Sequence, residues 1–345
     1  MKALVKYALG EGNMEIRDVP EPTPGPEQVK IEVKAAGICG SDLHIYHNDI
    51  KLALRPPVIV GHEFAGVIVE TGNAVSDFRI GERVTSETSA SVCGHCLACR
   101  AGYYNVCAEK KLTGYVFDGC FAKYCVVDAK RLHRLPESVD FLSAALTEPL
   151  ACCVHAVLEL TTVSAGDVVA ITGPGPIGLL CLQLAKAAGA YTILCGTNQD
   201  VERLQFARKL GADLAVNVQA EDALEAVKSR TDGEGADVVF ECSGAPAGAR
   251  LGLTLVRRRG QYTQVGLFGR PFELDFELIA YRELRVTGSL GQRYTAWKRS
   301  LALLERGQVN TKALVSHQFS LSQWREAFQA FEEKKGLKIV LLPEG

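Results

Sequence analysis

The 345-residue sequence lacks a long uninterrupted hydrophobic run. Its most apolar long stretch, residues 168–188, is broken by two glycines and two prolines at 173–176, whereas a membrane-spanning helix needs about twenty consecutive apolar residues. The hydrophobic block of a secretory signal is also missing after Met1, where the residues instead alternate as in a strand. We therefore expect a cytoplasmic protein without a membrane segment.

An excess of charge of one sign is missing too. The formal net charge is −2, with both signs scattered along the chain, whereas nucleic-acid-binding proteins normally carry a basic stripe. The nearest candidate, Arg257–Arg259, precedes Gly260 and is predicted to be a solvated helix end. We expect a small-molecule substrate and no nucleic-acid partner.

The composition, 47% hydrophobic and 23% charged, is typical of a globular protein, and the length favours two domains. Residues 1–150 are predicted to form a mostly β domain of short strands and turns. Residues 151–290 alternate strand and helix, which favours a parallel sheet covered on both faces and an α/β fold. Residues 291–345 are predicted to return to the first domain, ending in a strand at 338–342.

The boundaries of the predicted elements follow from hydrophobic periodicity. Trp324, Ala327, Phe328 and Phe331 share one face of a late helix. The other elements expected after residue 150 are strands at 168–171, 192–195, 214–218, 237–242 and 284–287, and helices at 177–188, 201–210 and 295–306.

A glycine-rich turn predicts a dinucleotide site. Gly173, Gly175 and Gly178 form a G-x-G-x-x-G fingerprint between a strand and a helix, which is the context that the motif requires. The first glycine makes the turn, the second admits a pyrophosphate and the third lets the helix pack on the strand. Pro176 and Ile177 open the helix, whose N-terminus favours phosphates.

The choice between NAD and NADP stays open. NAD-binding chains usually place a carboxylate at the end of the second strand to hold the ribose 2′-hydroxyl, but this chain has Gly196 and Thr197 there. Thr197 could donate to a 2′-phosphate and Arg203 could reach it from the next helix, although no arginine directly follows the strand.

Four of the twelve cysteines predict a metal site. Cys93, Cys96, Cys99 and Cys107 have the spacing C-x2-C-x2-C-x7-C, which suits a closed tetrahedral zinc site in the loop 93–107. Disulfides are disfavoured in a reducing compartment, and a four-iron cluster is the alternative occupant. His95 is superfluous once four thiols are present.

A second set of residues resembles a known family. Cys39, the run from Gly61-His62-Glu63 to Gly72, the four-cysteine loop and the fingerprint occur in the order found in zinc-dependent medium-chain alcohol dehydrogenases. The resemblance covers essentially the whole chain. It implies a GroES-like catalytic domain interrupted by a Rossmann domain with a doubly wound parallel sheet.

The resemblance also assigns roles. It implies Cys39, His62 and Glu63 as ligands of a catalytic zinc, with Glu148 as fourth ligand or as partner of the zinc-bound water. Zinc is thus expected twice per chain. Residues 148–156 resemble sorbitol (L-iditol) dehydrogenases, and Cys152 and Cys153 within them are predicted to be small buried residues.

The resemblance further implies Ser41 and His44 as a proton relay, although His44 could equally be an ordinary surface histidine. It implies Tyr46, Arg293 and Tyr294 as substrate contacts. Zinc lowers the pKa of bound water from 15.7 to about 7, on the order of 12 kcal/mol, whereas a general base supplies roughly 3–5 kcal/mol. Zinc is therefore expected to activate the hydroxyl group.

These observations predict an oxidoreductase that transfers hydride between a secondary alcohol, such as the polyols sorbitol or L-iditol, and NAD(P). Residues 42–46 also resemble L-threonine 3-dehydrogenases, and a 2,3-butanediol or glucose dehydrogenase is a further alternative. Two alternatives belong to other functional classes: a catalytically inactive NAD(P)-binding protein and a zinc-finger nucleic-acid module. By analogy with the family, a homotetramer or dimer is expected.

Overall fold

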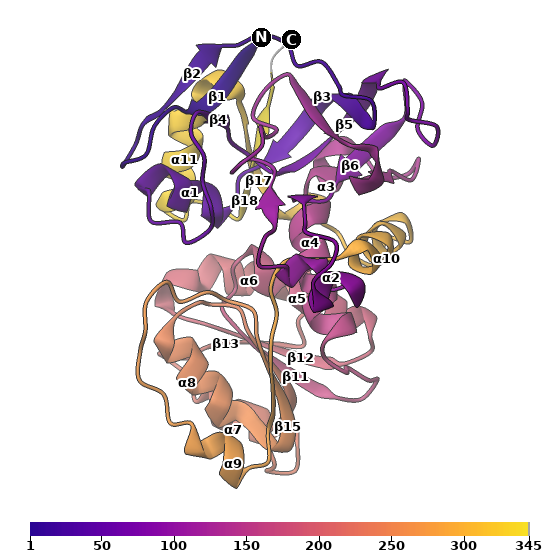
Figure 1. The fold of residues 1–345 in the computed structure, drawn as a ribbon. Coiled ribbons are helices and arrows are strands. Elements are labelled where there is room, and N and C mark those ends of the chain that lie inside the picture. The colour runs from indigo at the N-terminus through magenta and orange to yellow at the C-terminus, as the bar shows by residue number, and fades with distance from the viewer. Residues whose placement is uncertain (344–345) are drawn as a thin grey trace. The chain divides into compact units, whose positions relative to one another are not determined.

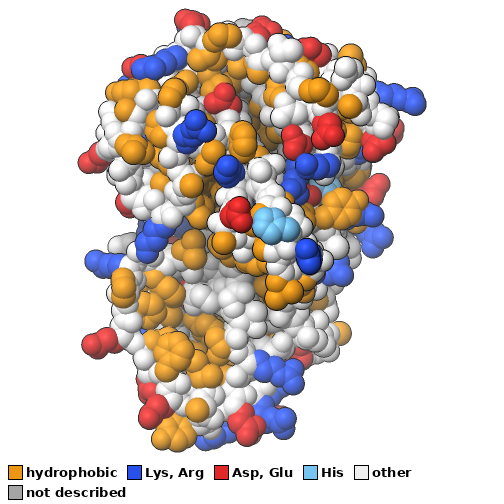
Figure 2. All heavy atoms as spheres, in the orientation of Figure 1, with side chains coloured by type: hydrophobic (Ala, Val, Ile, Leu, Met, Phe, Trp, Pro, Cys, Tyr) orange, Lys and Arg blue, Asp and Glu red, His pale blue; other side chains and the backbone are white. Residues whose placement is uncertain are grey.

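The computed structural model describes residues 1–343, which divide into two compact units. Among the described residues, unit 1 contains 1–151, 292–305 and 310–343, and unit 2 contains 152–291 and 306–309. The described residues contain no helix that is both long and apolar enough to span a membrane. Figure 2 shows acidic and basic side chains interspersed on the visible face.

Unit 1 is built mainly of β-sheets (Figure 1). Its largest sheet has the order β10-β6-β5-β3-β18-β17, with β9 also pairing with β3. A three-stranded sheet, β2-β1-β4, and the small β7-β8 pair complete it. The strands are β1 (Lys2–Lys6), β2 (Met14–Asp18), β3 (Gln28–Gly37), β4 (Val58–Ile59), β5 (Glu63–Thr71), β6 (Arg83–Ser86), β7 (Ser89–Ser91), β8 (Lys111–Leu112), β9 (Tyr124–Asp128), β10 (Leu132–Arg134), β17 (Val315–Ser320) and β18 (Lys338–Leu342).

The C-terminal strand of the chain belongs to this sheet, because β18 pairs antiparallel with β3 and parallel with β17. Helix α11 packs against β17 and β18 and buries Trp324, Ala327 and Phe328, the face that its periodicity predicts. The helices associated with unit 1 are α1 (Gly40–His47), α2 (Leu97–Arg100), α3 (Phe141–Ala145), α4 (Thr147–Val154), α10 (Tyr294–Glu305) and α11 (Trp324–Glu332).

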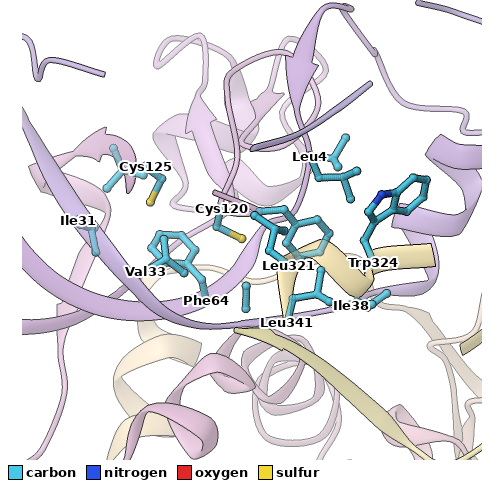
Figure 3. Close-up of a cluster of buried hydrophobic side chains, with 14 of the residues drawn as sticks. Leu4, Ile31, Val33, Ile38, Phe64, Cys120, Cys125, Leu321, Trp324 and Leu341 are labelled. Carbon is cyan, nitrogen blue, oxygen red and sulfur yellow. The ribbon is translucent and has the colours of Figure 1, made fainter. Parts of the chain in front are cut away.

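The core of unit 1 lies between its sheets and α11. Figure 3 shows Phe64, Cys120 and Leu341 among the apolar side chains that fill it, and all three are at most 1% exposed. Burial raises the pKa of the Cys120 and Cys125 thiols, which belong to the same cluster. These two cysteines therefore act as small hydrophobic residues.

Unit 2 is a six-stranded parallel sheet with the order β13-β12-β11-β14-β15-β16. Counted from its first strand this is 3-2-1-4-5-6, the doubly wound order of dinucleotide-binding domains. The strands are β11 (Val168–Thr172), β12 (Tyr191–Gly196), β13 (Leu214–Asn217), β14 (Ala236–Glu241), β15 (Val256–Gln264) and β16 (Arg285–Gly288), and the helices are α5 (Pro176–Ala187), α6 (Val201–Lys209), α7 (Ala223–Lys228), α8 (Pro246–Leu255) and α9 (Glu277–Tyr281).

The α/β fold class and the parallel sheet are therefore confirmed, and the predicted strands and helices after residue 150 lie within two residues of those observed. The prediction for Arg257–Arg259 is wrong. Helix α8 already ends at Leu255, and the three arginines begin strand β15, where the register with β14 shifts. Ion pairs of Arg257 with Asp237 and of Arg259 with Glu283 anchor this irregular segment.

Candidate active site

Strand pairing brings Cys39, His62 and Glu63 together. Strand β3 ends at Gly37, which pairs with Glu63 at the start of β5, so the chain on either side of this pair converges. One potential ligand atom of each of the three residues lies within 4.8 Å of the others. A thiol, an imidazole and a carboxylate are all zinc ligands, and an incomplete protein shell leaves room for a reacting molecule.

Asp42 orients this group, a role that the sequence analysis did not assign. Its fully buried carboxylate accepts the Cys39 N–H at 2.8 Å through Oδ2, and Oδ1 lies 3.6 Å from His62 Nδ1. A carboxylate behind an imidazole fixes the ring so that its other nitrogen can bind metal. Burial lowers the pKa of His62, but Tyr115 and Asp42 raise it by more, so the pKa lies above its ordinary value.

The two carboxylate oxygens of Glu63 have different surroundings. The Lys338 ammonium lies 2.5 Å from Glu63 Oε2 and also donates to the Ile38 carbonyl. Glu63 Oε1 is buried and has no hydrogen-bond partner among residues 1–343. A buried carboxylate oxygen without a partner is costly, and a metal ion would remove that cost. This geometry fits zinc.

The Lys338 ammonium is fully enclosed, and burial alone would lower its pKa. The negative charges of Glu63, Cys39 and Glu148 outweigh burial and raise that pKa above its ordinary value. Lys338 therefore stays charged beside the group. Its position could not be predicted, because no local motif links residue 338 to residue 63.

Helix α1 carries the predicted relay residues Ser41 and His44 and the predicted substrate contact Tyr46, and each has different neighbours. Ser41 Oγ lies 3.5 Å from His62 Nε2, so it borders the candidate metal position. His44 is more than half exposed and pairs with Asp49 at 2.8 Å. Tyr46 instead packs edge-on against Trp324 in the core beside α11.

Glu148 lies in the first turn of α4 and is held by Gln292. The Gln292 amide nitrogen donates to Glu148 Oε1 at 2.9 Å and to the Thr88 hydroxyl at 3.0 Å. Glu148 is not a member of the Cys39–His62–Glu63 group, but it contributes to the field at Lys338. Gln292 was missed by the sequence analysis, which chose its two neighbours instead.

Those neighbours, Arg293 and Tyr294, contact the four-cysteine loop. The Arg293 guanidinium lies 4.5 Å from the centre of the Tyr103 ring, and the Tyr294 N–H donates to the Tyr104 hydroxyl at 2.7 Å. The Tyr294 ring is half exposed beside His133.

The four-cysteine loop has the geometry of a single-ion site. All four sulfurs lie within 4.8 Å of one another, with Sγ–Sγ distances of 3.9 Å from Cys93 to Cys99 and 3.6 Å from Cys93 to Cys107. A tetrahedral site with Zn–S bonds of about 2.3 Å requires sulfurs about 3.8 Å apart. A multi-iron cluster is larger than one ion and would hold the thiolates farther apart, so it does not fit.

Backbone groups prepare this loop for anionic sulfur. The N–H groups of Cys96 and His95 lower the pKa of the Cys93 thiol to about 6. Desolvation and the neighbouring thiols raise the pKa of Cys99 to about 12, so four thiolates coexist here only around a cation. The exposed His95 ring bonds the Cys93 carbonyl through Nδ1.

In unit 2 the fingerprint has the conformation that a pyrophosphate turn requires. Gly173 has a φ of 93°, which favours glycine, and a Cβ on Gly178 would collide with the Gly173 carbonyl. A Cβ on Gly175 would meet no protein atom within 4 Å, so this backbone is open to a ligand. Pro176 and Ile177 form the first turn of α5, whose N-terminus favours phosphates.

A buried carboxylate supports the turn from the next strand. Glu241 ends β14 and accepts the N–H groups of Ser243 and Gly244 at 2.9 and 3.2 Å. Ser243 in turn lies against Gly173. Because β11 and β14 flank the point where the strand order reverses, this loop lies where doubly wound sheets bind ligands. No sequence motif pointed to Glu241.

Thr197 and Arg203 both contact Asp200. The Asp200 carboxylate accepts the Thr197 N–H at 3.0 Å and its hydroxyl at 2.8 Å, and the Arg203 guanidinium lies 3.9 Å away. A Cβ on Gly196 would lie 2.9 Å from Pro174 of the fingerprint, so the strand end has little room for a side chain.

Cys152 and Cys153, both predicted to be buried, differ in their burial. Cys153 is completely buried, its thiol contacts the Ile177 carbonyl, and burial raises its pKa. Cys152 is only half-buried, so the prediction of burial is wrong for this residue, and it lies outside the clusters of potential metal ligands among residues 1–343.

Comparison with known proteins identifies the family. Residues 25–137 match the family described as alcohol dehydrogenase GroES-like domain, and residues 176–306 match the zinc-binding dehydrogenase family. The chain is 47% identical to a sorbitol dehydrogenase of Halalkalibacterium halodurans over 99% of each protein. The chain belongs to the zinc-binding dehydrogenases.

Other relatives of this zinc-binding dehydrogenase match over nearly their whole length. A D-arabitol-phosphate dehydrogenase of Enterococcus avium is 40% identical over 99% of this chain and 97% of that protein. An L-threonine 3-dehydrogenase of Pyrococcus horikoshii is 39% identical over 99% and 98%. A protein from Sinorhizobium meliloti 1021 solved bound to NADP has a TM-score of 0.91 and 34% identity over 99% of both chains.

This zinc-binding dehydrogenase is therefore an oxidoreductase that uses zinc and NAD(P), as the sequence predicted. The GroES-like and Rossmann architecture is confirmed. A catalytically inactive binding protein and a zinc-finger module do not account for a whole-length match to dehydrogenases.

Proposed function

We propose that this zinc-binding dehydrogenase oxidises a secondary hydroxyl of a small polyol of the sorbitol or L-iditol type. The observation that carries the proposal is the 47% identity to a sorbitol dehydrogenase over 99% of both chains. The L-threonine 3-dehydrogenase is less similar, at 39%. The D-arabitol-phosphate dehydrogenase, at 40%, acts on another molecule of the polyol class.

Cys39, His62 and Glu63 would hold the catalytic zinc. When bound, zinc supplies a Lewis acid that polarises a hydroxyl oxygen. Asp42 lies beside the His62 ring, and Lys338 holds one oxygen of Glu63 while the other oxygen has no hydrogen-bond partner among the described residues. Cys93, Cys96, Cys99 and Cys107 would hold the structural zinc.

Oxidation of an alcohol also releases a proton, which must leave the site. The Ser41 hydroxyl borders His62 and can accept this proton while donating its own. His44, exposed on the same helix and paired with Asp49, can pass a proton to solvent through its ring nitrogens. We propose Glu148 as a carboxylate beside the reacting group and Ser41 and His44 as the exit route.

The hydride acceptor would bind along Gly173–Gly178, with its adenosine ribose near Thr197 and Arg203. The strand end carries Gly196 and Thr197 and therefore lacks the carboxylate that usually selects NAD. Asp200 already engages both predicted phosphate contacts. The missing carboxylate favours NADP, whereas the contacts of Asp200 with Thr197 and Arg203 disfavour it. The ratio of kcat/KM with NAD to that with NADP measures which of these two features dominates.

A substrate panel tests the proposal. Purified enzyme is offered sorbitol, L-threonine, 2,3-butanediol and glucose with each cofactor, and the absorbance of reduced nicotinamide is followed at 340 nm. We expect the highest kcat/KM with the polyol. His62→Ala should abolish the signal, whereas His317→Ala, which changes an exposed histidine on β17, should retain it. A higher kcat/KM with threonine, butanediol or glucose would contradict the polyol assignment.

The homotetramer or dimer and the cytoplasmic location remain predictions. Sedimentation of the purified enzyme tests the first, and cell fractionation tests the second.

A further inference from the structure

Gln292 is a buried amide whose donors are both directed at side chains. It is 3% exposed, and its nitrogen bonds the Glu148 carboxylate and the Thr88 hydroxyl. An amide nitrogen has two hydrogens, so both are used. A hydrogen bond to a charged group in a buried site fixes the position of that group more firmly than a neutral bond does.

Tyr104 connects the four-cysteine loop to the same region at two points. Its hydroxyl donates to Glu87 Oε2 at 2.7 Å and accepts the Tyr294 N–H at 2.7 Å. Glu87 directly precedes Thr88, and Tyr294 follows Gln292 by two residues. One hydroxyl therefore links the two backbone segments that carry Gln292 and its hydroxyl partner.

Glu87, at the far side of this connection, is buried and has further partners. Glu87 is 3% exposed and also contacts Arg131 Nη1 at 3.2 Å and His133 Nε2 at 3.1 Å. The His133 ring stacks on Trp297 of α10, with ring centres 5.4 Å apart and planes 7° apart. Because these side chains are buried and contact one another closely, we expect a change at Tyr104 to alter the positions of its neighbours.

From these contacts we propose that Gln292 is a positioning residue for the Glu148 carboxylate, and that Tyr104 transmits the geometry of the four-cysteine loop to it. The loop then supports turnover as well as folding. The proposal rests on the proposed role of Glu148 in the reaction.

The test is a double-mutant cycle with Gln292→Leu and Tyr104→Phe. Leucine keeps a similar size but cannot donate, and we expect kcat to fall by about tenfold to a hundredfold, the effect of losing a hydrogen bond to a charged group. Tyr104→Phe should lower kcat by roughly threefold to tenfold. The double variant should be no slower than Gln292→Leu alone, because both changes act on one carboxylate.

A spectroscopic readout accompanies the kinetics. In enzyme with cobalt at the catalytic site, Gln292→Leu should shift the visible absorption of the metal, and Tyr104→Phe should shift it in the same direction. Tyr124→Phe, which removes a hydroxyl from β9 outside this network, is the matched control and should change neither property. Gln292→Asn, which keeps the amide but shortens the side chain, should lie between wild type and Gln292→Leu, and melting curves identify any variant that fails to fold.

The outcomes distinguish the proposed role of Glu148 in the reaction from the proposed positioning role of Gln292. If Glu148→Gln retains full turnover, both the role of Glu148 and this inference are overturned. If Glu148→Gln is inactive but Gln292→Leu leaves kcat and the cobalt spectrum unchanged, only this inference is overturned. If the effects of Gln292→Leu and Tyr104→Phe simply multiply, Tyr104 does not act through Gln292.

Discussion

Lys338 Nζ lies 2.5 Å from Glu63 Oε2, although 275 residues separate the two in sequence. Both side chains are almost completely buried, at 4% and 1% exposed. The pairing of β18 with β3 places the lysine there. Because the lysine compensates the charge of Glu63, the third potential zinc ligand beside Cys39 and His62 can be a buried carboxylate.

Replacing Lys338 with methionine should destabilise the enzyme strongly. The variant keeps the aliphatic stem but leaves the buried Glu63 oxygen without its cation, a change that typically costs about 3–5 kcal/mol. Urea unfolding measures the loss. Lys335→Met, which removes an exposed partner of Glu333, is the control and should unfold close to wild type. Equal stability of the two variants would show that Lys338 is not needed to compensate Glu63.

Metal analysis should distinguish the two sites. Wild-type enzyme should contain about two zinc ions per chain, in keeping with one closed and one open site. Cys96→Ser should remove one ion and lower the melting temperature, because the closed site contributes folding energy. His62→Ala should also remove one ion but leave the fold stable. Loss of both ions in either variant would contradict separate sites.

Activity should depend on the Cys39–His62–Glu63 group far more than cofactor binding does. His62→Ala should lower kcat/KM by at least about a thousandfold, since Lewis-acid assistance supplies several kcal/mol. Quenching of protein fluorescence by NADH or NADPH should be unchanged, because the fingerprint lies in unit 2. Turnover that survives the substitution would remove the basis of the proposed mechanism.

Gly196→Asp should shift cofactor preference toward NAD. A carboxylate at the strand end repels a 2′-phosphate and can bond the ribose hydroxyls, so the NAD-to-NADP ratio of kcat/KM should rise by roughly tenfold or more. The added Cβ would also crowd Pro174. Gly196→Ala carries the same crowding without the charge and separates the two effects. If alanine shifts the ratio as much as aspartate, packing and not charge sets the preference.

Asp213 makes the stability of unit 2 depend on pH. Its carboxylate accepts from the Thr192 N–H at 2.7 Å and from Lys186 at 2.8 Å. Although desolvation raises the pKa of Asp213, these donors lower it by more, to below its ordinary value of 3.8. The carboxylate therefore stabilises the fold above about pH 3.8 and loses this effect as pH falls through the lower folded-state pKa.

Asp213→Asn should accordingly cost about 1 kcal/mol at pH 7. The difference from wild type should shrink in acid. Unfolding curves at pH 7 and at several values below pH 4 measure it, and a difference that grows in acid would reverse the assigned sign.

The prediction of the fold succeeded where the signal was local. Alternating strands and helices gave the parallel sheet, and the helical face of Trp324, Ala327 and Phe328 is buried as expected. It failed at Arg257–Arg259, because a charged tripeptide looks like a helix end and nothing local reveals that the segment joins strand β15 or that Arg257 pairs with Asp237.

For the candidate site too, the features with a local sequence signal were predicted and those that depend on long-range contacts were not. Short spacings bring chemical groups together whatever the rest of the chain does, so the sequence by itself determined the four-thiol loop and the glycine turn. Cys39, His62 and Glu63 were named only by the family resemblance, and the pairing of β3 with β5 brings them together. Only the tertiary structure placed Lys338 on Glu63, Asp42 behind His62 and Gln292 on Glu148. Such contacts depend on the register of strands and the packing of helices far apart in sequence, and a buried charge or amide leaves no periodic trace by which its partner could be recognised.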